Sequence, residues 1–265
     1  MQFREWMREN LGRAATHFGL DLLGEPRLGW MDRSIGALAG RGEQRFWLRV
    51  VSEDVRWASG DFWTGNLDST VLSSLAKPRV LDVYEWEEHR QQRAEVLTLL
   101  PGRPCSQSDV LREPVDLSEA WWVELRRTVD VLASTPTDRV NADQEMVGSR
   151  IRQRFSDSTD HVVPAWETAH GDLHWANLMG PDFGLLDWEG WGRGPAGTDA
   201  ATLLSYSLLV PEMVERVWSV FGDVLESKAG RLAQIYVASR LLQRIDKGDH
   251  PDLVPALRAH IETLL

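Results

Sequence analysis

Residues 170–177 read His-Gly-Asp-Leu-His-Trp-Ala-Asn, and residues 185–189 read Leu-Leu-Asp-Trp-Glu. Together they supply a carboxylate at Asp172, an amide at Asn177 and a second carboxylate at Asp187. A carboxylate beside a reacting hydroxyl can steer or accept its proton, and carboxylate and amide oxygens are hard ligands that suit Mg²⁺. This set of groups is what a metal-dependent phosphoryl-transfer site requires, because such a site mainly orients a hydroxyl and holds Mg²⁺ on nucleotide phosphates.

The polar residues of these stretches also have a simpler interpretation. Asp172 and Asn177 could cap the turns of two hairpins without taking part in any chemistry. Gly184 and the two apolar residues before Asp187 indicate a short buried strand that leaves a turn and carries the carboxylate. Because His, Asp, Asn, Asp and Glu follow in this order within twenty residues, we favour the phosphoryl-transfer interpretation.

The pattern HGDLHxxN followed by LDWE resembles the aminoglycoside phosphotransferase and choline kinase family, which are small-molecule kinases with a protein-kinase-like fold. Asp172 and Asn177 stand five residues apart, as in the catalytic loop of kinases. The resemblance implies an α+β, bilobal fold with a small strand-rich N-terminal lobe and a larger helical C-terminal lobe. It also implies that Asp172 is catalytic, that Asn177 and Asp187 bind Mg²⁺, and that ATP or GTP donates the phosphoryl group.

Composition limits the classes of partner that the chain can have. The net charge of −11 argues against nucleic acid, because phosphate backbones attract basic surfaces. No apolar run reaches the ~18 residues of a membrane span, and residues 1–13 lack the apolar core of a secretion signal. Cys105 is the only cysteine, so no intrachain disulfide or thiolate metal site can form. We therefore expect a cytoplasmic protein with no membrane partner, while its oligomeric state stays open.

The acidic excess lies mainly in the middle of the chain. Residues 101–204 contain 17 acidic and 9 basic residues, so this segment carries −8 of the net −11. The segment includes the metal-site acids and the part expected to shape the acceptor pocket, and a cationic acceptor would suit it. A solvated acidic surface explains the same distribution.

The hydrophobic pattern predicts a strand-rich first part and a helical second part. The expected elements of the first part are a helix over 2–19, strands over 27–30, 35–39 and 44–51, a helix over 65–75, and strands over 80–86 and 94–100. The breaker Pro-Gly-Arg-Pro at 101–104 marks a hinge. The expected lobes are 1–101, which binds the nucleotide, and 102–265, which holds the catalytic loop, the metal site and the acceptor pocket. The helices expected beyond the hinge are one capped by Asp116 or Ser118, one over 144–155, one over 198–209, and more to the C-terminus.

The resemblance implies that the turn at 29–34 and the strand at 44–51 contact the nucleotide. Backbone N–H groups of the turn and the Ser34 hydroxyl would bind phosphate oxygens, although a plain hairpin loop fits the same residues. The strand departs from the family pattern, because it offers Arg49 where a lysine is usual. By register Asp68 stands where the family has a helix glutamate to pair with that cation. Arginine is longer and planar, so this replacement is not conservative.

Leu100, at the end of the strand before the hinge, is also expected to contact the nucleotide. If Arg49 were instead an exposed edge residue paired with a surface acid, nucleotide affinity would be poor and the chain would be a pseudokinase.

Four further residues near the motif receive expected roles. The resemblance implies that His170 and His174 brace the catalytic loop, and that Asp199 opens the next helix and supports the loop. Trp175 could wall the acceptor site by stacking or cation–π contact, and packing in the core is the default for it.

The expected activity is therefore transfer of the γ-phosphoryl group of ATP or GTP to a hydroxyl of a small molecule. An aminoglycoside-like antibiotic is the favoured acceptor. A choline-, ethanolamine- or sugar-type metabolic kinase and a nucleotide-binding pseudokinase are the alternatives.

Overall fold

The computed structural model describes residues 3–156 and 159–265, and the chain separates into two units, Met1–Leu100 and Pro101–Leu265. The first unit is rich in strands and the second is mainly helical, which confirms the expected α+β class with its small strand-rich part and larger helical part. Within the described ranges, no helix combines the length and apolar character needed to cross a membrane.

The first unit is built on one antiparallel sheet. Its strands are β1 (Asp21–Leu22), β2 (Arg27–Leu28), β3 (Ser34–Arg41), β4 (Gln44–Glu53), β5 (Val80–Glu87) and β6 (Gln91–Leu97). They follow the order β1-β3-β4-β6-β5, and β2 pairs with β3. Strand β4 lies between β3 and β6 and pairs with both, while β3–β4 and β5–β6 form hairpins.

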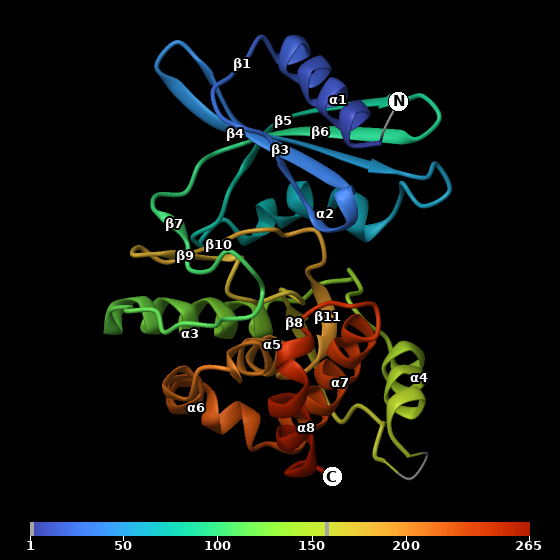
Figure 1. Cartoon of the computed structure of the whole chain (residues 1–265), viewed down its shortest axis with the longest axis vertical. Helices are drawn as coiled ribbons and strands as arrows, with labels where there is room; N and C mark the ends of the chain where they lie inside the picture. The colour runs from blue at the N-terminus through green and yellow to red at the C-terminus, as the bar shows by residue number, and fades with distance from the viewer. Residues whose placement is uncertain (1–2, 157–158) are drawn as a thin grey trace. The chain divides into compact units, whose positions relative to one another are not determined.

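The two faces of this sheet differ in chemistry, because successive side chains of a strand point to opposite sides. Helix α1 (Phe3–Phe18) covers the apolar face, where Met7 and Leu11 pack into a core with Leu48 and Val50 of β4. Helix α2 (Asp61–Asp68) lies on the other face (Figure 1), which carries Arg49 and its neighbours. The predicted helix over 2–19 is thus confirmed, with residue 2 outside the described residues.

Two predicted elements of the first unit have wrong boundaries. The helix expected over 65–75 starts earlier, at Asp61, and changes to a 3₁₀ turn at Ser69–Leu72. The hydroxyls of Ser69 and Thr70 donate to the carbonyls of Asn66 and Leu67, and such local bonds compete with continued α-helix.

The strand expected over 94–100 is β6, Gln91–Leu97, which begins three residues sooner. The missed start, residues 91–93, contains the buried polar side chains of Gln92 and Arg93 and so lacks the apolar pattern that is typical of a buried strand.

The described part of the second unit contains six α-helices, one sheet of three short strands and one of two. The helices are α3 (Glu119–Ser134), α4 (Gln144–Arg154), α5 (Thr198–Ser207), α6 (Pro211–Leu225), α7 (Lys228–Ile245) and α8 (Val254–Glu262). The strands are β7 (Arg103–Pro104), β8 (Trp166–Ala169), β9 (Leu178–Gly180), β10 (Gly184–Leu185) and β11 (Gly192–Pro195). Of the two predicted caps of α3, Ser118 is the N-cap, since its side chain accepts a hydrogen bond from the Trp121 N–H.

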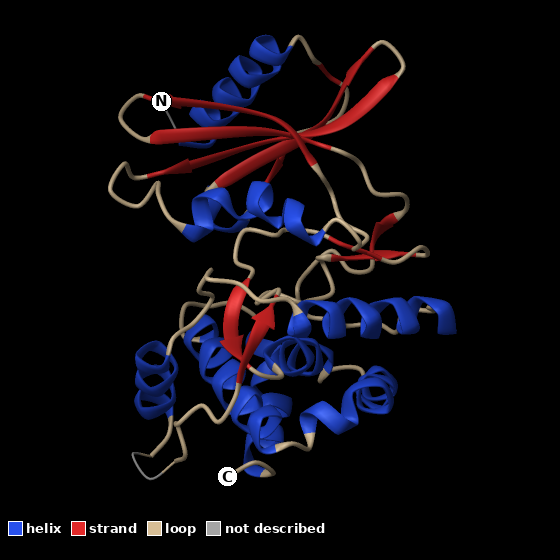
Figure 2. Cartoon of the chain, turned by 180° about the vertical axis from the view of Figure 1, so that it is seen from behind, coloured by secondary structure: helices blue, strands red, loops and turns tan. Residues whose placement is uncertain are grey.

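Two small sheets hold the segments 170–177 and 186–191 in place. Strand β8 pairs with β11, and β9 pairs with β10 and β7 (Figure 2). Residues 170–177 run from β8 to β9, and residues 186–191 run from β10 to β11. Both motif segments are therefore short connections whose two ends are fixed by strand pairing.

The contact of α1 with the sheet yields a stability prediction. Leu11 is fully buried, so Leu11→Ala should lower the free energy of unfolding of the first unit by about 2–5 kcal/mol through lost burial and the cavity left behind. Urea denaturation followed by circular dichroism measures this change. Leu81→Ala is the matched control, because Leu81 is 53% exposed, and equal small shifts for both variants would contradict the packing described.

Candidate active site

The backbone of the loop 170–177 is held by one buried carboxylate. The N–H groups of His170 and Gly171 donate to Oδ2 and Oδ1 of Asp199 at 2.7 and 2.9 Å. Gly171 has a φ of +81°, and a Cβ there would lie 2.1 Å from Asn141 Nδ2, so only glycine fits. Asp199 stands in the first turn of α5, and each of its oxygens thus fixes one peptide of the loop.

Two effects act on the pKa of Asp199 in opposite directions. Burial raises its pKa to about 7, and the N–H groups of His170 and Gly171 act in the opposite direction by favouring the ionised form. Burying this acid is costly, and its hydrogen bonds from two peptide N–H groups offset part of that cost.

Asp172 projects from the loop and is partly exposed, at 43% of its side chain. Its Oδ2 lies 3.3 Å from His174 Nε2, and Arg240 of α7 donates to the adjacent carbonyl of Gly171 at 3.2 Å. Burial alone would raise the pKa of Asp172, but His174, Arg240 and His170 outweigh it and hold that pKa well below its usual range. The carboxylate is therefore ionised at neutral pH.

The same loop also sets the states of its two histidines. Burial lowers the pKa of His170 to about 4, so its neutral ring donates from Nε2 to the Leu186 carbonyl at 3.0 Å. Burial also opposes protonation of His174, but attraction by Asp172, Asp109 and Asp187 prevails and raises its pKa. His170 thus braces the segment before Asp187, and His174 supports Asp172.

Asn177 and Asp187 lie on adjoining segments. The Leu186 N–H donates to the Asn177 carbonyl at 2.8 Å, which brings the residue before Asp187 against Asn177. The Asn177 Nδ2 donates to the Asp172 carbonyl at 3.0 Å and so fixes the orientation of the amide. Asp187 is exposed and has a φ of +59°, a conformation that non-glycine residues adopt at a cost and that is common at functional sites.

Asn177 and Asp187 carry the kind of oxygen atoms that Mg²⁺ binds. Within residues 3–156 and 159–265, no group of three or more His, Cys, Asp or Glu is arranged to hold a metal ion. The Oδ1 of Asn177 and the Asp187 carboxylate offer two hard oxygen ligands. Mg²⁺ commonly takes one or two protein oxygens and completes its shell with water and phosphate oxygens.

A charged network beside the loop was missed by sequence reasoning. Arg244 of α7 donates to Asp109 at 2.6 Å, to the Tyr206 hydroxyl at 2.8 Å and to Asp249 at 2.9 Å. Burial acts to raise the pKa of Asp109, but His174 and Arg244 outweigh it and lower that pKa. Asp109 and Arg244 are 135 residues apart, so no local pattern could have joined them.

Two residues singled out in the sequence have structural roles. Trp175 is 0% exposed, stacks against Trp121 with ring centroids 6.4 Å apart, and donates from Nε1 to Ser207 Oγ at 2.9 Å. The hypothesis that it walls the acceptor site is therefore wrong, and core packing holds. Burial raises the pKa of the Cys105 thiol to about 12, so this cysteine is not a nucleophile.

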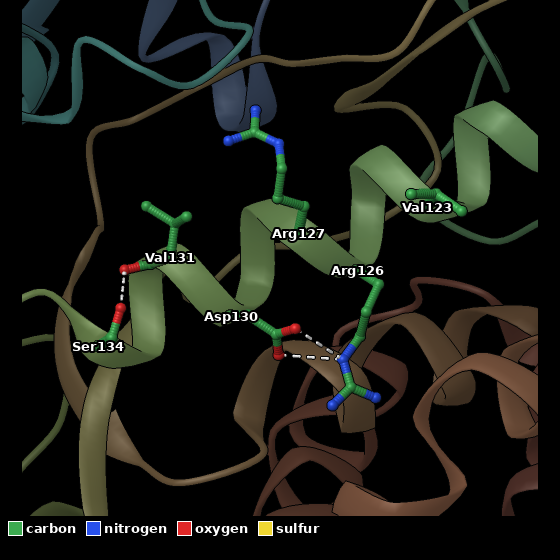
Figure 3. Close-up of a pocket in the computed structure, with 6 residues that line it drawn as sticks. All are labelled: Val123, Arg126, Arg127, Asp130, Val131 and Ser134. Atoms are coloured by element: carbon green, nitrogen blue, oxygen red, sulfur yellow. Dashed lines mark hydrogen bonds and ion pairs between the residues drawn. The ribbon is translucent and has the colours of Figure 1, made fainter.

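A surface hollow of about 410 Å³ lies along α3 and is separate from these groups. Figure 3 shows its lining on that one helix: Val123, Arg126, Arg127, Asp130, Val131 and Ser134. Arg126 is paired with Asp130 at 3.0 Å and with Asp223 at 2.8 Å. The hollow is thus lined by satisfied surface charges and by none of the candidate catalytic residues.

In the first unit, Arg49 lies on the central strand β4 and is 14% exposed, so it is not an exposed edge residue. Its Nη1 lies 3.7 Å from Oε2 of Glu95 on β6, a residue that sequence reasoning missed. The Asp68 carboxylate accepts a hydrogen bond from Thr64 at 2.5 Å within α2.

The remaining nucleotide candidates occupy a turn and a strand exit. The turn after β2 forms a 3₁₀ segment at Trp30–Asp32, in which Met31 and Asp32 have φ values of 53° and 58°. Ser34 starts β3, and its carbonyl accepts from the Gly29 N–H at 2.8 Å. Leu100 is partly buried and follows the end of β6 as the last residue of the first unit.

The double acceptor role of Asp199 can be tested by Asp199→Asn. The new amide presents a donor to one of the two backbone N–H groups, so the variant should lose about 1–3 kcal/mol of unfolding free energy. Thermal and urea unfolding measure this loss. Asp116→Asn, at an exposed site, is the control, and an equally small effect in both variants would contradict the role.

Comparison with known proteins supports the fold. No family model and no curated protein matches the sequence. The aminoglycoside phosphotransferase APH(3'')-Id from Streptomyces rimosus superposes with a TM-score of 0.57 and 16% identity, over 88% of this chain and 97% of that one. The aminoglycoside phosphotransferase APH(4)-Ia gives 0.58 and 13%, over 96% of this chain and 98% of that one.

The amicoumacin kinase hAmiN, solved in complex with AMP-PNP, Ca²⁺ and Ami, gives a TM-score of 0.55 and 14% identity over 97% of this chain and 92% of its own. Identities this low establish the fold and not the substrate. The chain therefore has the bilobal, protein-kinase-like fold of the aminoglycoside phosphotransferases and related small-molecule kinases, as its motif resemblance implied.

Proposed function

We propose that this protein is a Mg²⁺-dependent kinase that transfers the γ-phosphoryl group of ATP or GTP to a hydroxyl of a small molecule. The observation that carries the proposal is the way the second unit gathers three groups. Asp199 fixes the loop that bears Asp172, and the bond from the Leu186 N–H to the Asn177 carbonyl sets Asn177 beside the segment of Asp187.

In this proposal Asp172 orients the acceptor hydroxyl toward the γ-phosphorus. The acceptor oxygen forms a bond to phosphorus, the bond to the β-phosphate oxygen breaks, and the nucleoside diphosphate leaves. The hydroxyl proton passes to Asp172 and then to solvent. Because the low pKa of Asp172 makes it a weak base, its main contribution is orientation of the nucleophile, which suits a loose phosphoryl-transfer transition state.

The donor nucleotide requires cations and metal ligands. Asn177 and Asp187 would hold Mg²⁺, which when bound neutralises charge on the β- and γ-phosphates. The first unit, proposed as the nucleotide-binding lobe, would contribute Arg49 to the phosphates. Asp68, Ser34 and Leu100 remain candidates for nucleotide contacts. The complex of hAmiN with AMP-PNP supports a nucleotide donor for this fold.

A cationic acceptor such as an aminoglycoside-like antibiotic is favoured. Asp109 belongs to the acid-rich segment 101–204 and lies near His174 of the loop, and Arg244 bonds both Asp109 and Asp249. Two of the structural neighbours are aminoglycoside phosphotransferases. Trp175, one of the aromatic residues of this segment, is buried in the core and offers no surface to a quaternary amine, the acceptor of the choline-type alternative. We place the reaction in the cytoplasm, where nucleoside triphosphates are available.

The proposal is tested by a screen of Mg²⁺-dependent nucleotide consumption with ATP and GTP. The acceptors are aminoglycosides, nucleoside and macrolide antibiotics, choline and simple sugars. Acceptor-stimulated turnover should fall by about 10²–10⁴ in Asp172→Asn. Asp182→Asn, at an exposed position on the β9–β10 turn, should turn over like the wild type. If Asp172→Asn kept most of the rate, the catalytic assignment would be wrong.

The metal assignment is tested separately with Asp187→Asn. Removing one of two proposed protein ligands should weaken the apparent Mg²⁺ affinity at least about tenfold, the lower end of what loss of an outer-shell partner costs a metal site. Titration of Mg²⁺ at fixed nucleotide, read as nucleotide binding or turnover, measures the shift. An unchanged Mg²⁺ dependence would remove Asp187 from the metal site.

A further inference from the structure

One face of the first unit's sheet carries a row of charged residues, which we call the polar face and define as Arg49, Glu85, Arg93 and Glu95. Arg49 of β4 stands opposite Glu95 of β6, and Arg93 of β6 stands opposite Glu85 of β5. Residues two apart on a strand share a face, so these four side chains belong to one side of the sheet. The apolar face beneath α1 lies on the other side.

Glu95 is the centre of this row and is buried, at 2% exposure. Its Oε1 accepts from Arg93 Nε at 3.0 Å, and its Oε2 accepts from Asn66 Nδ2 of α2 at 2.8 Å. The same Oε2 lies 3.7 Å from Arg49 Nη1. Arg93 is held in turn by Glu85 at 2.5 Å. The carboxylate of Glu95 is therefore fixed on one side by Arg93 and Asn66 and presents its charge to Arg49.

Stability of the fold alone does not call for such an arrangement. Taking charges out of water is costly, and a buried ion pair can often be replaced by apolar side chains at no loss of stability. An apolar set would also suit a central strand, as it does on the opposite face. The charges of the polar face have an explanation if one of them, Arg49, has to be held in position for a ligand.

We propose that Glu95 is the positioning residue that aims Arg49 at the phosphates of the nucleotide, an inference that rests on the proposed kinase function. The separation of 3.7 Å exceeds the roughly 2.7–2.9 Å of a charge-assisted hydrogen bond, so Glu95 orients Arg49 by charge and not by a direct hydrogen bond. The guanidinium has five N–H donors in a planar fork, which suits phosphate oxygens.

This arrangement has a mechanical consequence. Arg49 and Glu95 stand on adjacent, hydrogen-bonded strands, so the sheet register sets their spacing. In the proposal, this fixed spacing keeps the carboxylate of Glu95 beside Arg49 before nucleotide binds. Arginine has a long side chain, which suits a residue that starts on the central strand β4 and has to reach a phosphate.

The experiment measures binding to the full-length protein by calorimetry, using AMP-PNP or its guanosine counterpart with Mg²⁺, and the matching nucleoside without phosphates. The readout is the ratio of the two dissociation constants, which reports the phosphate contribution alone. Glu95→Gln should weaken triphosphate-analogue binding by about tenfold or more and leave nucleoside binding unchanged. Glu87→Gln, at an exposed position of β5, is the matched control and should change neither.

The direction of the effect is diagnostic, because Glu95→Gln removes a negative charge near the phosphates. If the carboxylate only repelled phosphate, the variant would bind the analogue more tightly. Unchanged or tighter analogue binding would overturn the proposal. A positioning role also requires that Glu95→Gln has no effect on analogue binding in an Arg49→Met background, and an undiminished effect there would overturn it as well.

A folding defect in Glu95→Gln would not leave the question open. Glu95→Asp keeps the charge and shortens its reach, so it should fold and show an intermediate loss of analogue affinity with unchanged nucleoside affinity. A wild-type affinity ratio in Glu95→Asp would count against positioning by Glu95. If the wild-type protein bound neither triphosphate analogue, the proposed function itself would fail, whereas wild-type binding with an unaltered Glu95→Gln ratio would overturn only this inference.

Discussion

The carboxylate of Asp199 accepts the N–H groups of His170 and Gly171, and the candidate active site depends on this one buried interaction. It fixes the backbone just before Asp172, while Gly171 provides the left-handed turn that lets the loop approach Asn141. From that fixed point the loop returns through Asn177, whose carbonyl accepts from the segment before Asp187. Without it, the two peptide N–H groups that precede Asp172 would lose their acceptor.

In the first unit, the corresponding arrangement holds the cation of Arg49 on a sheet. Its apolar face buries α1 and supplies stability, while its polar face carries alternating charges in which each cation meets an anion. Each unit thus contains a buried acid, Asp199 or Glu95, beside groups to which we assign a ligand in the proposed function. Each acid is tolerated in the interior because donors surround it.

The sequence predicted those features that neighbouring residues determine. The motif at 170–177, helix α1 and the hairpin of β3 and β4 are specified by neighbouring residues and were found. The start of β6 was misplaced because Gln92 and Arg93 are polar, and the end of α2 was misplaced because the hydroxyls of Ser69 and Thr70 bond to its carbonyls. Glu95 and the pair of Asp109 and Arg244 could not be found, since their partners are set by sheet register and by helix packing. The burial of Trp175 likewise depends on packing against α3 and α5.

The central claim is that this loop directs a phosphoryl group to an organic hydroxyl and not to water. A single-turnover reaction with γ-labelled nucleotide, excess protein and Mg²⁺, followed by separation of products, tests this most directly. With a suitable acceptor, the label should appear in the organic product and stay in the nucleotide when the acceptor is omitted. Label that appears only as inorganic phosphate for every acceptor, at the same rate in the wild type and in Asp172→Asn, would contradict the account.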